Sequence, residues 1–186
     1  MDFLKVIRDV GGALDAARVR YALIGGFAMA LHGVQRATVD LDFILMLDDL
    51  NRTDQILIGA GYHRVFSSEN VSHYIADSPD LGRIDLLHAF RGPSLSMLKR
   101  AERIEIAANL WLPVVQIEDL IGLKIQAAVN DEQRAAADWS DIQLMIQASA
   151  LAEHSLDWSL IEDYLDLFGL KSKLPRMRTW HGQTNG

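Results

Sequence analysis

An alternating apolar and acidic segment near residue 40 constrains the fold of this chain more than any other feature. The segment reads Val39-Asp40-Leu41-Asp42-Phe43-Ile44-Leu45, and such alternation is typical of a β-strand. In a strand, Asp40 and Asp42 lie on one face while Leu41 and Phe43 point to the other. Two neighbouring carboxylates on an apolar strand are costly unless a cation neutralises them. The pattern therefore predicts a site for a hard divalent cation, with magnesium as the first candidate.

A diglycine turn precedes this acidic pair. The apolar residues 21–24 run into Gly25 and Gly26, and residues 27–33 follow with a helical pattern. Glycines at a strand-to-helix turn let backbone N–H groups approach an anion, and the dipole of the helix favours negative charge there. The turn therefore predicts a phosphate-binding loop, with a purely structural turn as the alternative.

Together, these residues resemble the signature of the nucleotidyltransferase superfamily related to DNA polymerase beta. In that signature an apolar strand ends in Gly-Gly or Gly-Ser, and an Asp-x-Asp pair follows. More narrowly, the additional residues 32–33 (His-Gly) and 36–38 (Arg-Ala-Thr) are similar to the AbiEii-type abortive-infection toxins and the small MNT proteins. These families usually carry serine at the position of Gly26, so this chain lacks one hydroxyl contact to phosphate.

The resemblance implies an α+β fold, with a mixed sheet flanked by helices and a C-terminal helical extension. It also implies a third carboxylate on a later strand, for which Asp85 in the segment 83–87 (Arg-Ile-Asp-Leu-Leu) is the candidate. Asp40, Asp42 and Asp85 would then be the catalytic residues and would hold two magnesium ions, with a nucleoside triphosphate (NTP) such as ATP as the substrate. The alternative for Asp85 is an aspartate hydrogen-bonded to the backbone at a strand end.

The nucleotide itself would be bound by residues that the resemblance also implies. These are Gly25, Gly26, Arg36, Thr38, Lys124 and Asp141. Lys124 lies in an apolar helical segment and would contact phosphate, while Asp138 and Asp141 form a downstream acidic motif that shares a helix face. The alternatives are that Arg36 pairs with Asp40 or Asp42, that Lys124 extends along a half-buried helix, and that the two aspartates cap the next helix.

Length and composition favour one enzyme domain with a small extension. The chain has 186 residues, 49% of them hydrophobic, and no cysteine, which excludes a disulfide framework and a thiolate metal site. We find no apolar stretch long enough for a membrane span or a signal peptide, and we therefore expect a cytoplasmic protein that makes no contact with a membrane. The formal charge of −7 gives no general attraction to nucleic acid.

The periodicity of the sequence predicts a sheet with flanking helices at 1–115, a helical extension at 116–170 and a flexible polar tail at 171–186. The resemblance implies that the first part is the catalytic core. A first helix over 2–18 is expected to be interrupted at Gly11-Gly12. Other helices are expected at 27–33, 48–60, 94–107, 117–129, 134–151 and 157–168. Strands are expected at 21–25, 39–47, 62–66, 71–76, 83–89 and 111–115.

The resemblance implies transfer of a nucleoside monophosphate (NMP) to an acceptor hydroxyl, with release of pyrophosphate. The implied setting is a toxin-antitoxin or phage-defence system, in which tRNA or a protein is the acceptor and a cognate antitoxin or toxin is a partner. One alternative is an antibiotic nucleotidyltransferase. Another is a catalytically silent binding partner, which the glycine at position 26 favours and the three carboxylates oppose.

Overall fold

The computed structural model describes residues 1–182, and the chain divides into two compact units. Unit 1 comprises Met1–Ala28 and Arg36–Gln116, and unit 2 comprises Met29–Gln35 and the chain from Ile117 onward. The α+β class expected from the sequence is confirmed, since unit 1 contains a mixed sheet with helices and unit 2 is helical.

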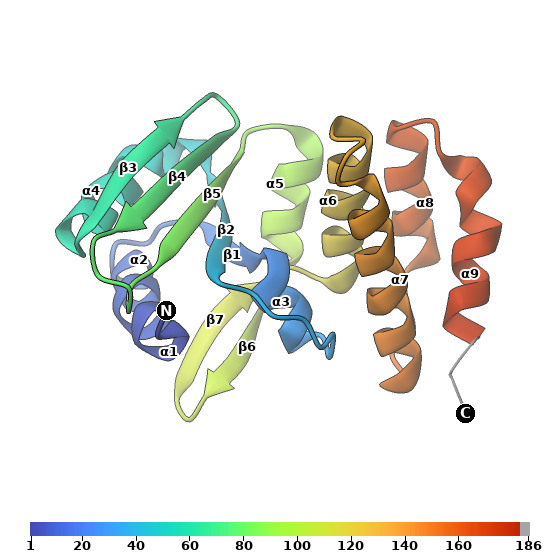
Figure 1. Ribbon diagram of the computed structural model, residues 1–186, viewed down its shortest axis with the longest axis horizontal. Coiled ribbons are helices and arrows are strands. Elements are labelled where there is room, and N and C mark those ends of the chain that lie inside the picture. The colour runs from blue at the N-terminus through green and yellow to red at the C-terminus, as the bar shows by residue number, and fades with distance from the viewer. Residues whose placement is uncertain (183–186) are drawn as a thin grey trace. The chain divides into compact units, whose positions relative to one another are not determined.

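The strands of unit 1 form one seven-stranded sheet in the order β3-β4-β5-β2-β1-β7-β6 (Figure 1). Strands β2 and β5 are parallel, as are β1 and β7, and the other neighbours are antiparallel. The strands are β1 (Tyr21–Ile24), β2 (Asp40–Met46), β3 (Tyr62–Ser67), β4 (Val71–Ala76), β5 (Arg83–Ala89), β6 (Glu102–Ala107) and β7 (Leu110–Val114).

Strand β2 lies near the middle of the sheet because its apolar residues are buried. Leu41, Phe43 and Leu45 are at most 1% exposed, whereas Asp40 and Asp42 on the other face are half-buried.

The helical segments that begin in unit 1 are α1 (Phe3–Val6), the π-helix η1 (Ile7–Gly11), α2 (Gly12–Ala16), α3 (Gly25–Leu31), the 3₁₀ turn η2 (Leu47–Asp49), α4 (Leu50–Gly59) and α5 (Gly92–Arg100). α4 packs against β3, and α5 packs against β2 and β5.

Unit 2 is built from helices that pack through apolar side chains. Its elements are α6 (Ile117–Asn130), α7 (Ala135–Leu151), α8 (Trp158–Leu167), the 3₁₀ turn η3 (Lys171–Lys173) and α9 (Leu174–Gly182). α6 packs against α7 and α8. Gly122 permits the contact with α8, because a Cβ atom there would lie 2.7 Å from the ring of Tyr164. The Tyr164 hydroxyl donates a hydrogen bond to Asp119 Oδ1 at 2.7 Å.

Two expectations about secondary structure are wrong. The helix expected at 94–107 ends at Arg100, because Ala101 turns to φ −57° and ψ 134° and residues 102–107 form β6 against β7. The interruption expected at Gly11-Gly12 is absent, since η1 continues into α2. Gly11 instead allows close packing, because a Cβ atom there would lie 2.8 Å from Leu112 Cδ1.

Within the segment 171–186, expected to be a flexible tail, residues 171–182 form η3 and α9, and residues 183–186 lie outside the described chain. Helix α9 packs against α7, and Met177 is fully buried. The ammonium of Lys173 lies 4.8 Å from the ring centre of Trp139, which adds a cation–π contact. The buried Met177 and the contact of Lys173 with Trp139 both help to hold this polar segment against the other helices of unit 2.

Candidate active site

The strand register brings the predicted acidic residues together on one face of the sheet. Asp42 pairs with Asp85 across the parallel strands β2 and β5, and Asp40 pairs with Arg83 one step along. Paired residues on neighbouring strands point to the same face, and so do residues two apart on one strand. Asp40, Asp42, Asp85 and Arg83 therefore form a single group of charged side chains, which we call the carboxylate row.

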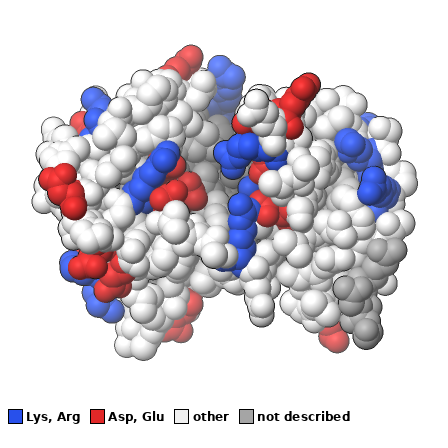
Figure 2. All heavy atoms as spheres, in the orientation of Figure 1, with Lys and Arg blue, Asp and Glu red and all other residues white. Residues whose placement is uncertain are grey.

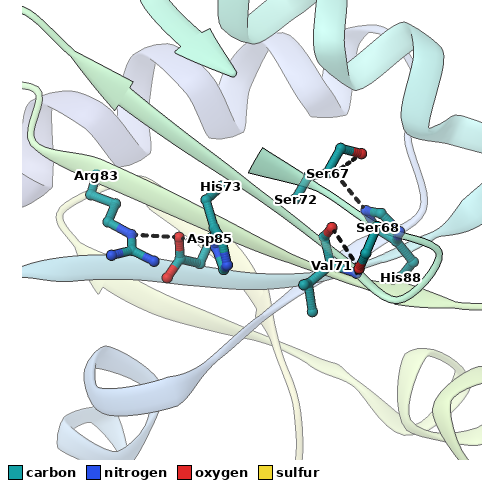
Figure 3. A network of polar contacts seen from close by, with 8 residues as sticks. All are labelled: Ser67, Ser68, Val71, Ser72, His73, Arg83, Asp85 and His88. Atoms are coloured by element: carbon teal, nitrogen blue, oxygen red, sulfur yellow. Dashed lines mark hydrogen bonds and ion pairs between the residues drawn. The ribbon is translucent and has the colours of Figure 1, made fainter. Parts of the chain in front are cut away.

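Two side chains hold Asp85 in place (Figure 3). Arg83 Nε and His73 Nδ1 each lie 2.7 Å from Asp85 Oδ1. A carboxylate paired with arginine accepts hydrogen bonds, so the hydrogen in the second contact belongs to His73 Nδ1. His73 comes from β4, directly opposite Asp85 in the register. The hydrogen bond to Asp85 raises the pKa of Arg83, and the charges of Asp85, Asp40 and Asp42 raise it further.

The glycine turn lies directly against this row. Gly25 has φ +69°, a conformation that side-chain-bearing residues rarely adopt. A Cβ atom at Gly25 would lie 2.0 Å from Asp42 Oδ2. Both facts require glycine here, whatever the turn binds.

The second glycine of the turn contacts Thr38. A Cβ atom at Gly26 would lie 2.9 Å from the Cβ of Thr38. The Thr38 hydroxyl donates a hydrogen bond to the backbone oxygen of Asp40 at 3.1 Å, which ties the segment before β2 to the start of the row. Arg36, another predicted nucleotide contact, is exposed two residues earlier.

The residue types of the row fit a magnesium site, because three carboxylates are the oxygen donors that hard cations prefer. The arrangement of these side chains, however, is not that of a metal site. Within residues 1–182, no three histidine, cysteine, aspartate or glutamate side chains are gathered closely enough to hold a metal ion. Asp85 Oδ1 is instead occupied by Arg83 and His73. The role of Asp40, Asp42 and Asp85 as metal ligands therefore remains a prediction.

The remaining predicted residues lie in unit 2, where they form a buried cluster. Lys124 Nζ lies 2.7 Å from Asp138 Oδ1 and 2.7 Å from Asp141 Oδ2. The three side chains are only 16%, 2% and 8% exposed. Lys124 thus joins α6 to α7 between two carboxylates, and Asp138 Oδ2 is buried with no hydrogen-bond partner.

A serine–histidine pair on the other face of β4 and β5 has a structural role. Ser72 Oγ lies 3.0 Å from His88 Nε2 (Figure 3). His88 Nδ1 lies 2.9 Å from the carbonyl oxygen of Glu69. Ser72 is fully buried and His88 is 3% exposed. A nucleophile must reach its substrate, so we interpret this pair as a buried link between strands.

Sequence reasoning missed Arg83 and His73 as members of the site. Arg83 lies two residues before Asp85, a spacing that places both on one face of a strand and signals an ion pair. His73 has no comparable signal, because its contact with Asp85 depends on the pairing of β4 with β5.

Neither the face seen in Figure 2 nor the helices of the described chain indicate a particular large partner. Basic and acidic side chains are interspersed over the face seen in Figure 2. None of the helices formed by residues 1–182 combines the length and the apolar character that a bilayer crossing requires.

Comparison with known proteins supports the fold. No protein-family model matches the sequence, and no curated protein matches it. Among solved structures, the antibiotic-resistance factor ANT(2'')-Ia is 15% identical with a TM-score of 0.64, and the match covers 97% of this chain and 100% of that one. A nucleotidyltransferase-like protein of Paracoccidioides brasiliensis is 18% identical with a TM-score of 0.59, with 97% and 92% covered. The lincosamide adenylyltransferase LnuA is 14% identical with a TM-score of 0.50, with 63% and 82% covered.

These proteins share the nucleotidyltransferase fold with this chain. At identities of 14–18% this likeness shows the fold alone, and membership of the expected superfamily stays a prediction. The narrower likeness to AbiEii-type and MNT proteins rests on the sequence motifs only.

Proposed function

We propose that this protein transfers an NMP from an NTP to an acceptor hydroxyl and releases pyrophosphate. The observation that carries the proposal is the register of β2 and β5, which aligns Asp42 with Asp85 beside the Gly25 turn. A row of carboxylates at a glycine turn is suited to a charged phosphate substrate that arrives with divalent cations. The nucleotidyltransferase fold adds support.

In this mechanism Asp40, Asp42 and Asp85 would hold two magnesium ions, which when bound neutralise the triphosphate and acidify the acceptor hydroxyl. Asp85, oriented by Arg83 and His73, accepts the proton of the acceptor hydroxyl. The hydroxyl oxygen bonds to the α-phosphorus, and the bond from that phosphorus to the bridging oxygen of pyrophosphate breaks. Orienting the reacting groups supplies a large part of the rate.

Backbone N–H groups at Gly25 and Gly26 would contact the phosphates. Arg36 and Thr38, which precede Asp40 in the sequence, would also bind the nucleotide. We retain Lys124 and Asp141 as proposed nucleotide contacts. For Lys124 this role requires exchange of an aspartate partner for a phosphate oxygen, since both Asp138 and Asp141 hold its ammonium in unit 2.

For the acceptor, we propose tRNA or a protein hydroxyl in a toxin-antitoxin or phage-defence system, with a cognate protein partner. The support is the sequence likeness to AbiEii-type and MNT proteins around Gly25, Gly26 and the Asp40-x-Asp42 pair. An acceptor of this kind needs only a hydroxyl that reaches the carboxylate row.

A second candidate acceptor is a cationic antibiotic. The whole of ANT(2'')-Ia is covered by the structural match, and that protein has been solved in complex with adenylyl-2''-tobramycin.

The test is mass spectrometry of tRNA, cell proteins and tobramycin after incubation with each NTP and magnesium. We expect one of these acceptors to gain the mass of an NMP, and Asp42→Asn to abolish the gain while its circular dichroism stays that of the wild type. If no acceptor gains mass and no NTP binds in the presence of magnesium, the silent binding partner is favoured instead.

A further inference from the structure

Arg83 occupies a position among the three carboxylates that a metal ion would otherwise neutralise. Its Nε lies 2.7 Å from Asp85 Oδ1, and it stands directly opposite Asp40 in the register. Its side chain is 40% exposed, compared with 22% for Asp85. The guanidinium is thus partly exposed within the row, rather than a buried structural cation.

The charges of this group are unequal. The register sets three carboxylates and the guanidinium of Arg83 on this face of the sheet. One carboxylate oxygen, Asp85 Oδ1, already accepts hydrogen bonds from both Arg83 and His73. A metal ion that bound Asp85 would meet a fixed positive charge within ion-pair distance of its own ligand, and like charges at that distance repel strongly.

We propose that Arg83 is an internal counter-ion that weakens metal binding to the carboxylate row until an NTP is bound. The proposal rests on the function proposed above. Arg83 and the metal compete for the same carboxylates, so replacing Arg83 with a neutral side chain removes the competitor. It also raises the negative potential that attracts a divalent cation.

The bound NTP would relieve this competition. A triphosphate adds several negative charges beside the row, which offset the repulsion between Arg83 and the metal and offer the guanidinium another anionic partner. By linkage, the nucleotide and the metal then raise each other's affinity by the same factor. The resting protein would carry little metal, and loading would follow nucleotide binding.

The experiment measures binding of Mn²⁺, used as an EPR-visible substitute for magnesium, to the full chain without nucleotide. We compare the wild type with Arg83→Gln, which is neutral, and Arg83→Lys, which keeps the charge. We expect Arg83→Gln to bind Mn²⁺ about tenfold more tightly or better, and Arg83→Lys to stay near the wild type. Adding a non-hydrolysable NTP should tighten Mn²⁺ binding more in the wild type than in Arg83→Gln.

Arg103→Gln is the matched control. Arg103 also pairs with a single aspartate in unit 1, at 2.8 Å from Asp15 Oδ2, and is 52% exposed. Asp15 is not part of the carboxylate row, so this variant should bind Mn²⁺ as the wild type does. If Arg83→Gln fails to fold by circular dichroism, Arg83→Met is measured by the same criterion.

Each result decides the proposal. Equal or weaker Mn²⁺ binding in Arg83→Gln than in the wild type overturns the proposal and assigns Arg83 to orienting Asp85. The proposed transfer reaction would still stand in that case, provided that the wild type binds Mn²⁺. Tighter binding that survives Asp42→Asn would place the metal elsewhere and also overturn it. No Mn²⁺ binding in any variant, even with the NTP, would overturn both this proposal and metal-assisted transfer.

Discussion

The carboxylate row of unit 1 and the buried cluster of unit 2 both pair aspartates with a cation, but they differ in burial. In unit 1, the side chains of Asp85 and Arg83 are 22% and 40% exposed on one face of the sheet. In unit 2, Lys124 and Asp138 are 16% and 2% exposed between helices. The first group is accessible to solvent and ligands, and the second is enclosed by the packing of α6 on α7.

This difference indicates what each group can do. A partly exposed ion pair contributes little to stability, so it can exchange one partner for another at small cost. A buried pair contributes little net stability when intact, but loss of one partner leaves an uncompensated charge in the interior. We therefore expect substitutions in the carboxylate row to change function, and substitutions in the buried cluster to change stability.

The largest effect is expected from Asp42→Asn in the carboxylate row. Asp42 lies between Asp85 and the Gly25 turn, where it would hold the magnesium that neutralises the phosphates. We expect NMP transfer to fall by roughly a thousandfold, on the scale of losing one stabilising group at a reacting centre. The measurement is the rate of pyrophosphate release with a saturating acceptor.

The urea midpoint of Asp42→Asn should remain close to that of the wild type, because the side chain is half-buried. If Asp42→Asn transfers NMP at the wild-type rate, the carboxylate row does not have the function that we assign to it.

The next effect is on stability in unit 2. Lys124→Met leaves Asp138 and Asp141 buried without their shared cation, and we expect a loss of about 3–5 kcal/mol in the free energy of unfolding. Urea denaturation measures it. Lys171→Met is the control, since Lys171 is 53% exposed beside Glu162; a similar loss in both variants would show that burial is not the cause.

Gly25→Ala tests the turn beside the row. The added methyl group meets Asp42 Oδ2 and the backbone is strained at φ +69°, so we expect a loss of about 3 kcal/mol. Gly12→Ala is the matched control, because Gly12 is helical at φ −61° with open space at its Cβ position. The free energy of unfolding of Gly12→Ala should rise by about 0.5–1 kcal/mol. Thermal unfolding of both variants measures the difference, and a Gly25→Ala variant as stable as Gly12→Ala would contradict the prediction.

The smallest effect is expected at Gly26. An added Cβ atom contacts Thr38 at 2.9 Å, but alanine also favours the helix that begins here, so Gly26→Ala should cost only about 1 kcal/mol. In a Thr38→Gly background the contact is absent and the cost should vanish. A double-mutant cycle measured by urea denaturation gives the coupling, and additive effects would exclude the contact as the cause.

The sequence predicted those parts of the molecule that depend on local pattern. Alternating apolar residues predicted β2 and β5. The Asp40-x-Asp42 spacing predicted that the two carboxylates lie on one face of the strand. The motif resemblance selected Asp85, and the register sets it beside Asp42.

Features that depend on distant partners were not predicted. Residues 102–107 form an exposed edge strand whose pattern resembles a helix, and only pairing with β7 defines it. Helix α9 is polar in sequence and is stabilised by docking on α7. The contact of His73 with Asp85 likewise requires the β4–β5 register.

The most direct test of metal-assisted nucleotidyl transfer is a calorimetric titration of the wild type and Asp42→Asn with a non-hydrolysable NTP, with and without magnesium. The account predicts nucleotide binding by the wild type that strengthens when magnesium is added, and loss of that magnesium dependence in Asp42→Asn. Nucleotide binding that is indifferent to magnesium, or equal in the two proteins, would contradict it.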